Sequence, residues 1–398
     1  MPAATEIHSD NQSSDVTENS RNEIAQGIPL VERLRARIER AGPISFRDWM
    51  QLALYDEREG YYCRSDRLRW GRLGDYRTAP ESSPLFAATI ARYFAKLFSE
   101  PGSPPSWTIF EAGAGAGEFA RGVLTALRSG YPQAFAATSY VIDEVSADAR
   151  AQSAERLSEF GDRVTFRALA EVTRPASAGI VFSNELIDAF PVHRVTVRGE
   201  KLRELCVGLN DREDFVWIEC DLDERVAEYC ERAGLHLAEG QTFEVNLGAE
   251  DFISRAASLL ERGFVITIDY GAERNELVSA PLRREGTLRA FHRHQIVDDV
   301  LARPGEQDLT TTVDWTQMRE AGERAGLQTV RHERLDQFLL QEGLLEVLET
   351  LVHEMTNEAE VLRLRTGARE MIMPHGLAAS FQILVQEKLR LASREVLR

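Results

Sequence analysis

The stretch FEAGAGAGEFARG, residues 110–122, combines the residue types of a ligand-binding loop. It follows a short apolar run and precedes a run with helical spacing, and a turn between a strand and a helix presents backbone N–H groups to a ligand. Glycines there let the backbone approach the ligand closely and adopt positive φ. The dinucleotide pattern G-x-G-x-x-G is not met, because Glu118 stands where the third glycine belongs. The stretch instead has one acid followed by three alternating glycines: Glu111, Gly113, Gly115 and Gly117.

A pair of acids ends the next apolar run, SYVIDEVS, where Asp143 and Glu144 stand. An acid at the end of the second strand of a nucleotide-binding fold binds ribose hydroxyls. Both acids fall further downstream than the usual ~20 residues, because RSGYPQAFAATS lengthens the connection. Successive residues of a strand point to opposite faces, so only one of the two can face a ligand. The alternative is a tight strand–helix turn with solvated acids.

A third polar group follows a later apolar run, in SNELIDAFP at residues 183–191. Glu185 and Asp188 lie three residues apart, and they share a face if residues 185–189 form one helical turn. Paired carboxylates at the end of a strand can hold a guanidinium by bidentate hydrogen bonds. The alternative is that Asn184 and Asp188 only cap and end a turn. We favour a functional role, because ligands of open α/β sheets bind at the carboxyl ends of strands.

The elements that position these residues alternate between strand and helix. Five apolar runs predict strands: WTIFEAG, SYVIDEVS, RVTFRAL, AGIVFSNEL and GFVITIDYG. Helical spacing separates the first ones, as in EFARGVLTALRSG, where one face is apolar. The pattern predicts an α/β fold with a parallel sheet and helices on both faces. An insertion with antiparallel strands follows the fourth strand, at about residues 195–246. We expect a disordered tail at 1–26, a helical region at 27–105 and a core at 106–398.

The composition excludes several functions. The formal charge is −17 and the isoelectric point about 5.1, and an acidic surface repels phosphate backbones, so no nucleic-acid partner is expected. No run of 18 apolar residues occurs, so no membrane span is expected. The four cysteines form no zinc-binding spacing, and no metal site is expected. Residues 1–20 lack Lys and Arg, which argues against a secretory signal or a mitochondrial transit peptide and predicts a cytoplasmic protein.

Several further stretches suggest a family. They are GPISFRDWMQLALYDEREGYY, GDYRTAPESSPLF, VFSNELIDAFPVHRV, GTLRAFHRH and PGEQDLTTTVDW, in this order. Together with the E-x-G-x-G-x-G loop, they resemble the S-adenosylmethionine (SAM)-dependent methyltransferase family that includes the mitochondrial complex I assembly methyltransferase and its bacterial relatives. The resemblance covers roughly residues 30–390. It implies a class I methyltransferase core, a Rossmann-like sheet, with an N-terminal helical region and an insertion after strand four. It implies methylation with SAM as the cofactor and protein arginine as the substrate of the mitochondrial member.

The resemblance also assigns site residues. The three glycines would approach the methionine part of SAM, Glu111 would help to hold its α-amino group, and Glu144 would bind the ribose. The segment GDYRTAPE would close over the cofactor, with the polar positions Gly74, Asp75, Thr78 and Glu81. Asn184 and Glu185 would lie beside the transferring methyl. Two positions depart from the family pattern: Tyr76 stands where Phe is usual, and Phe291 stands where Tyr is expected.

Three functions follow from these residues. The first is a methyltransferase that acts on arginine in a partner protein, with Glu185 and Asp188 as the catalytic residues. The second is a small-molecule N- or O-methyltransferase, and the third is an assembly factor that binds SAM without turnover. The sequence favours an enzyme, because the loop, the ribose acid and the strand-four acids are all intact. It gives no prediction of the oligomeric state.

Overall fold

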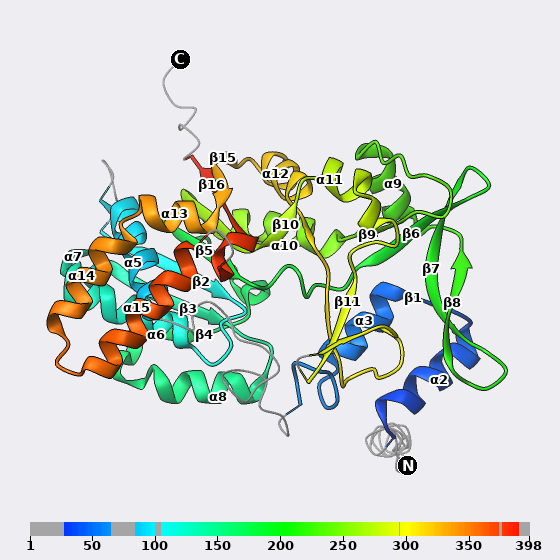
Figure 1. The fold of residues 1–398 in the computed structure, drawn as a ribbon, viewed down its shortest axis with the longest axis horizontal. Coiled ribbons are helices and arrows are strands. Elements are labelled where there is room, and N and C mark those ends of the chain that lie inside the picture. The colour runs from blue at the N-terminus through cyan, green and yellow to red at the C-terminus, as the bar shows by residue number, and fades with distance from the viewer. Residues whose placement is uncertain (1–27, 65–83, 100–104, 294, 374–375, 390–398) are drawn as a thin grey trace, which may run out of the picture.

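The computed structural model describes residues 28–64, 84–99, 105–293, 295–373 and 376–389. The described residues form two lobes that lie side by side (Figure 1). The core lobe contains the large central sheet and the C-terminal helices. The accessory lobe contains the N-terminal helices and the antiparallel insertion.

The central sheet of the core lobe has eight strands in the order β15-β16-β10-β5-β2-β3-β4, with β14 paired to β10. The strands are β2 (Trp107–Ala112), β3 (Thr138–Asp143), β4 (Val164–Phe166), β5 (Gly179–Asn184), β10 (Gly263–Ala272), β14 (Val313–Asp314), β15 (Gln328–Arg334) and β16 (Phe381–Lys388). The five strands predicted from apolar runs all pair in parallel. Strand β16 runs antiparallel between β10 and β15. The structure therefore confirms an α/β fold with a mostly parallel sheet.

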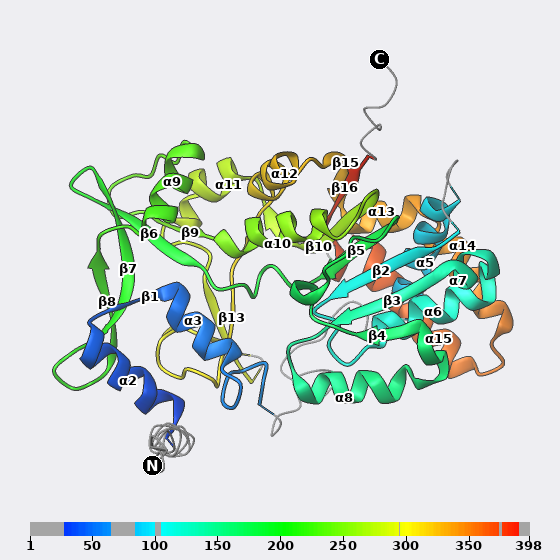
Figure 2. The same cartoon turned by 180° about the vertical axis from the view of Figure 1, so that it is seen from behind.

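Helices cover both faces of this sheet (Figure 2). One face is covered by α5 (Pro84–Phe98), α6 (Glu118–Gly130), α13 (Leu335–Gln341), α14 (Leu344–Glu354) and α15 (Glu358–Ile372). The other is covered by α10 (Leu247–Ser258) and α12 (Trp315–Arg324). The predicted apolar face of α6 is buried, and the ring of Phe119 stacks on Phe182 of β5 at 4.3 Å. This packing fixes the glycine loop that begins α6 relative to the end of β5. Helices α7 (Pro132–Ala137) and α8 (Ala147–Arg156) flank β3.

The accessory lobe is built on a second, antiparallel sheet in the order β1-β7-β6-β9, with β8 paired to β7. Its elements are β1 (Ile44–Ser45), β6 (His193–Arg198), β7 (Lys201–Leu209), β8 (Phe215–Cys220), β9 (Thr242–Val245), α2 (Leu30–Ala41), α3 (Phe46–Tyr55) and α9 (Glu224–Arg232). The insertion thus contains the antiparallel strands that its sequence indicates. Helices α2 and α3 pack on this sheet, whereas α5 packs on α6 in the core lobe. The helical region at 27–105 therefore contributes to both lobes.

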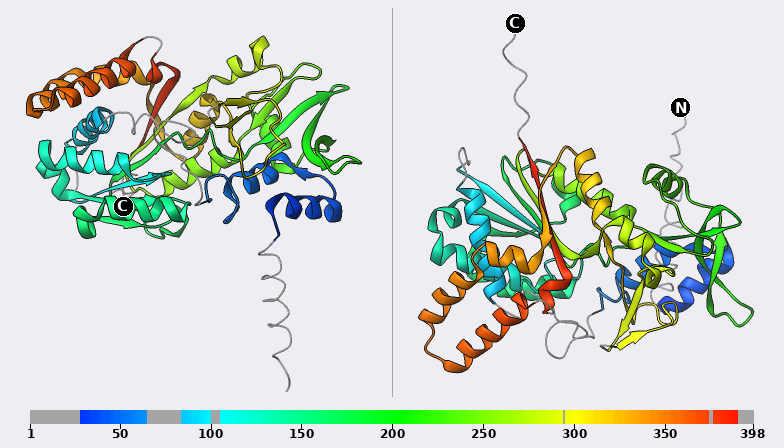
Figure 3. Two further views of the ribbon diagram at one scale, coloured as in Figure 1. Left: turned by 60° about the horizontal axis from the view of Figure 1, so that its bottom comes forward. Right: turned by 45° about the horizontal axis from the view of Figure 1, so that its top comes forward.

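A small third sheet borders both lobes. It has the order β12-β11-β13, with β11 (Arg289–His292), β12 (Gln295–Val297) and β13 (Asp308–Thr310), and follows α11 (Arg274–Ser279). Ala290 and Leu309 of this sheet are buried together with α2 and α3. Figure 3 shows the yellow strands of this sheet on the side of the green accessory strands, away from the orange helix pair α14–α15. The small sheet thus lies beside the carboxyl ends of the central strands.

Candidate active site

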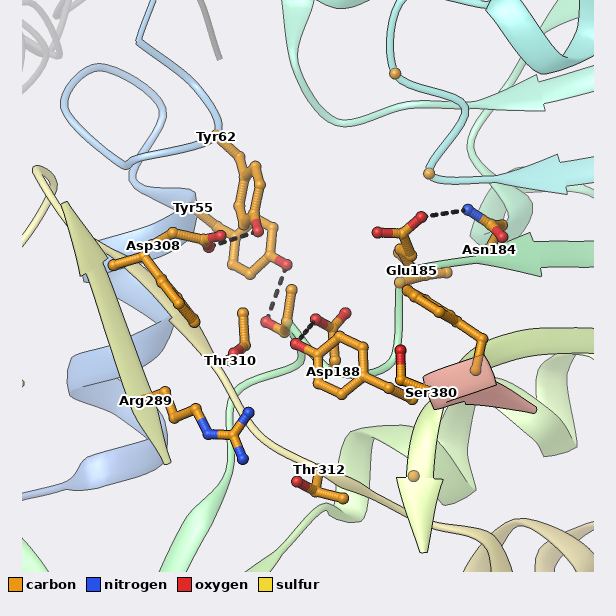
Figure 4. A pocket seen from close by; sticks show the side chains of 18 of the residues that line it. Tyr55, Tyr62, Asn184, Glu185, Asp188, Arg289, Asp308, Thr310, Thr312 and Ser380 are labelled. Atoms are coloured by element: carbon orange, nitrogen blue, oxygen red, sulfur yellow. Dashed lines mark hydrogen bonds between the residues drawn. The ribbon is translucent and has the colours of Figure 1, made fainter. Parts of the chain in front are cut away.

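A cavity of about 650 Å³ lies at the carboxyl ends of β2, β5 and β10, where these strands meet the accessory lobe and the small sheet (Figure 4). Strand β2 connects through α6 to β3 on one side, and the chain later returns to β5 on the other side. Such a reversal leaves a crevice between the two connections, which is where open α/β sheets bind ligands. The volume is within the range of about 300–1,000 Å³ for small-molecule sites.

The glycine loop forms one wall of this cavity. Gly113 and Gly115 line it and have φ of 71° and 52°, which favour glycine. A Cβ at position 113 would lie 2.8 Å from Cδ1 of Leu186, so no larger residue fits without a shift. The backbone N–H of Gly115 donates to Oε2 of Glu144 at 2.8 Å. The loop therefore offers an open backbone surface next to a carboxylate.

Glu144 and Asp143 point in different directions, as strand alternation requires. Glu144 lines the cavity, and its Oε1 accepts a hydrogen bond from the backbone N–H of Ser146 at 2.8 Å. Asp143 does not line the cavity, and its Oδ2 accepts a hydrogen bond from the backbone N–H of Leu169 at 3.0 Å. These residues fit SAM: a glycine cradle for close approach and one carboxylate placed to accept hydrogen bonds from ribose hydroxyls.

Two residues of the glycine motif lie elsewhere. Glu111 is buried inside the sheet, where its Oε2 accepts a hydrogen bond from the hydroxyl of Tyr140 at 2.7 Å. Burial raises the pKa of Glu111 to about 8. Gly117 is the N-cap residue of α6 with φ of 80°, and a Cβ there would lie 2.3 Å from Oγ of Ser153 on α8. The structure therefore does not bring Glu111 to the cavity, and it explains Gly117 by close packing of two helices.

The four positions expected in a segment that covers the cofactor, Gly74, Asp75, Thr78 and Glu81, lie outside the described residues.

The segment after β5 forms the floor of the cavity, but it is not the helical turn that the spacing of its acids suggested. Residues 185–189 form a bend and a hydrogen-bonded turn, and Glu185 has φ of 51°, in the left-handed region. A non-glycine residue in this region costs roughly 1–3 kcal/mol, and such strain is frequent at functional sites. Asn184 donates from Nδ2 to Oε1 of Glu185 at 3.1 Å. Asn184, Glu185 and Asp188 all line the cavity, so the structure brings these residues together without a helix.

Asp188 is a deeply buried carboxylate of the cavity, with 6% of the residue exposed. Its Oδ2 accepts a hydrogen bond from the hydroxyl of Tyr270. Its Oδ1 has no hydrogen-bond partner within the described part of the chain. Burial raises the pKa of Asp188 to about 6, while the hydrogen bond from Tyr270 lowers it. Asp188 therefore lines the cavity with one carboxylate oxygen bonded to Tyr270 and the other, buried oxygen without a hydrogen-bond donor in the described residues.

Asp269, at the end of β10, holds the segment that carries Asp188. Its Oδ2 accepts hydrogen bonds from the backbone N–H groups of Ile187 at 3.0 Å and Asp188 at 3.3 Å. It is fully buried, and burial raises its pKa. Asp269 thus stabilises the backbone shape that follows the left-handed Glu185.

The wall opposite the glycine loop comes from residues for which no site role was predicted. Tyr55 and Tyr62 stack with ring centroids 5.4 Å apart. The hydroxyl of Tyr55 donates to the carbonyl oxygen of Ala189 at 3.1 Å, and that of Tyr62 donates to Oδ1 of Asp308 at 2.7 Å (Figure 4). The available signal was that these residues fall in two of the family-like stretches, GPISFRDWMQLALYDEREGYY and PGEQDLTTTVDW.

Comparison with known proteins agrees with this geometry. Residues 89–332, more than half of the chain, match the model of the family Methyltransf_28, which is described as an S-adenosyl-L-methionine-dependent methyltransferase. The chain belongs to this family. It is a SAM-dependent methyltransferase, as the resemblance implied, and SAM is its cofactor. A crystal structure from Burkholderia thailandensis with bound S-adenosylhomocysteine is 29% identical, with a TM-score of 0.79 and 94% of each chain covered.

Curated relatives of this methyltransferase carry a more specific name. The mouse protein, protein arginine methyltransferase NDUFAF7, mitochondrial, is 26% identical, with 95% of this chain and 89% of the mouse protein covered. The homologue from Drosophila melanogaster is also 26% identical, with 89% and 84% covered. Both are named as mitochondrial, which contradicts the expectation of a cytoplasmic protein; the lack of Lys and Arg in residues 1–20 was a poor guide to location. None of the described helices is long and apolar enough to cross a membrane.

Proposed function

We propose that this methyltransferase transfers a methyl group to a guanidinium nitrogen of arginine in a partner protein. One observation carries the proposal: the carboxylates of Glu185, Asp188 and Asp308 line the same cavity as the glycine loop. The names of the curated relatives, which are protein arginine methyltransferases, support it.

The free oxygen of Asp188 fits a guanidinium. A guanidinium is planar, stays charged and has five N–H donors in a fixed fork. An unpaired buried carboxylate oxygen is costly, so a donor that enters the cavity is stabilised there. A guanidinium can contact Asp188 with one edge and Glu185 with another, and charge-assisted pairs of this kind are stronger than neutral hydrogen bonds. The two carboxylates would fix which nitrogen faces the glycine loop.

Positioning is the main task of the protein in this reaction, because bound SAM supplies a methyl group that is already activated. A new C–N bond forms as the S–CH3 bond breaks and S-adenosylhomocysteine leaves, and the attacking nitrogen releases a proton. Glu185 and Asp188 lie where they can accept that proton. Asp188 suits this role, since its pKa of about 6 leaves it charged at neutral pH and still able to bind a proton.

The cofactor contacts are also part of the proposal. Gly113 and Gly115 approach the methionine part of SAM, Glu144 accepts hydrogen bonds from the ribose hydroxyls, and Asn184 lies beside the methyl group. The positions of these four residues around one cavity support the assignment. Glu111 and Gly117 are left out, because their side chain and Cβ position face the protein interior.

The test is the fate of a labelled methyl group. Purified protein and SAM with a tritiated methyl are incubated with a lysate of cells that lack the gene, and hydrolysed protein is analysed for methylarginines. We expect labelled methylarginine with the wild type, at least ~10²-fold less with Glu185→Gln or Asp188→Asn, and the wild-type level with Glu231→Gln, an exposed acid on α9. Label only in small molecules would favour a metabolite substrate, and no transfer at all would favour an assembly factor.

A further inference from the structure

Two arginines line the cavity on the side of the small sheet, Arg283 and Arg289. Neither guanidinium makes a hydrogen bond or an ion pair within the described ranges. Other arginines near the cavity differ: Arg274 is paired with Asp314 at 2.9 Å and with Glu320 at 2.9 Å. In a chain with a formal charge of −17, two unpaired cations at one cavity indicate a site for an anionic group.

The backbone between these two arginines is anchored. Oε2 of Glu244 accepts hydrogen bonds from the backbone N–H of Thr287 at 2.7 Å and from its hydroxyl at 3.1 Å. Arg194 donates from Nη2 to the carbonyl oxygen of Glu285 at 2.6 Å. Arg289 itself pairs in β11 with Thr310 of β13. A guanidinium on a fixed backbone loses less entropy when it binds a ligand than one on a loose loop.

We propose that Arg283 and Arg289 bind the carboxylate of an acidic residue that lies close in sequence to the target arginine of the substrate. This inference rests on the proposed function. Figure 4 shows Arg289 on the opposite side of the cavity from Glu185, with Asp188 between them. The carboxylates of Glu185 and Asp188 and the guanidinium of Arg289 therefore line different sides of the cavity, and Asp308, on the side of Arg289, accepts a hydrogen bond from Tyr62. A peptide with both charges can bind in one direction only, which selects the substrate and its orientation.

Planar forks make arginine suited to bidentate binding of a carboxylate. The same pair could instead hold the carboxylate of the cofactor or a free anion. We favour the substrate carboxylate for the following reason. Arg283 and Arg289 lie just before and within the small sheet, whereas the residues proposed to bind the cofactor, the glycine loop and Glu144, follow β2 and β3. The affinity of the arginine variants for S-adenosylhomocysteine distinguishes a cofactor carboxylate from a substrate carboxylate.

The experiment measures peptide binding by the full-length protein saturated with S-adenosylhomocysteine. Fluorescent peptides contain one arginine and either Asp or Asn at each position within four residues of it. We expect Asp at one position to lower the Kd about tenfold relative to Asn, the scale of a hydrogen bond between charged groups. In Arg289→Gln and Arg283→Gln this preference should fall to about twofold or less. Arg365→Gln, at an exposed arginine on α15 without a side-chain hydrogen bond or ion pair in the described residues, is the matched control and should keep the preference.

Charge reversal makes the test specific. Arg289→Glu should favour Lys over Asp at the same peptide position. The inference is overturned if Asp gives no advantage at any position, or if the advantage is the same in Arg289→Gln and Arg365→Gln. It is also overturned if Arg289→Gln weakens binding of S-adenosylhomocysteine and leaves the peptide preference intact.

Failure of this inference is distinguishable from failure of the proposed function. If arginine peptides are methylated and bound equally well with Asp or Asn, only the role of Arg283 and Arg289 is refuted. If the protein methylates no arginine in any protein or peptide, the proposed function is refuted, while the binding comparison still decides whether the two arginines select a carboxylate.

Discussion

The hydrogen bond between Tyr270 and Asp188 gives a prediction that depends on the details of the cavity. Tyr270→Phe removes the hydroxyl that donates to Oδ2 of Asp188 and keeps the ring, which packs edge-on against Phe381 with centroids 5.7 Å apart. That hydrogen bond lowers the pKa of Asp188, and burial raises it to a net value of about 6. Removal of the donor must therefore raise the pKa further.

The size of the shift follows from the kind of bond. A hydrogen bond to a charged group contributes about 1.5–3 kcal/mol, and one pKa unit corresponds to about 1.4 kcal/mol. The pKa of Asp188 should rise by roughly one to two units in Tyr270→Phe. If the charged form of Asp188 holds the guanidinium, kcat/KM of the wild type falls as the pH drops through about 6. In the variant, the same fall should occur roughly one to two pH units higher.

The assay is kcat/KM for an arginine peptide between pH 5 and pH 9, with the affinity for S-adenosylhomocysteine measured at each pH as the control. Asp188→Asn should show low activity without this acid limb. An acid limb at the same pH in Tyr270→Phe and in the wild type would refute the role of Asp188, and so would a shift toward lower pH.

Four further variants test the other assignments. Gly115→Val should abolish SAM binding in calorimetry and leave the circular dichroism spectrum of a folded protein, because a branched side chain at φ of 52° is strained and enters the cofactor space; retained binding would contradict the cradle. Glu144→Ala should weaken SAM by ~1–3 kcal/mol, whereas Asp143→Ala should change only the melting temperature; the reverse result would exchange their roles. Glu111 has a pKa of about 8 in the folded protein against an ordinary 4.5, so the folded state binds the extra proton and the free energy of unfolding falls as the pH rises from about 4.5 to about 8. Glu111→Gln should remove this loss, so in urea unfolding at pH 9 it should be more stable than the wild type, and its affinity for SAM should be unchanged. If the difference in the free energy of unfolding between variant and wild type does not change with pH, Glu111 is not protonated beside Tyr140.

The sequence predicted the half of the site that follows the central strands. Apolar runs with glycine or acid at their ends define β2, β3 and β5, and parallel strands bring these ends to one edge of the sheet. The alternation of side chains allowed only one of Asp143 and Glu144 to face a ligand. The same rule could not place Glu111, because both faces of β2 are buried and neither direction leads visibly to a ligand.

The other half depends on contacts between distant segments. Tyr62 and Asp308 are 246 positions apart in the chain and meet through a side-chain hydrogen bond. Neighbouring residues in the sequence do not predict the left-handed backbone of Glu185. The segment that follows it is held by Asp269, which lies 81 and 82 positions away from the two backbone N–H groups that it binds. Pattern and propensity describe neighbours in sequence, and these contacts arise only when distant segments of the chain pack together.

The most direct measurement of the central claim is a comparison of proteomes by mass spectrometry. Cells that lack the gene are complemented with the wild type, with Glu185→Gln or with the control Glu231→Gln, and peptides are searched for methylated residues of every type. The account predicts at least one peptide with methylated arginine that is present with the wild type and Glu231→Gln and absent with Glu185→Gln and without the gene. A methylated arginine that persists with Glu185→Gln would contradict the assigned role of this carboxylate, and a proteome in which no methylarginine depends on the gene would contradict arginine methylation itself.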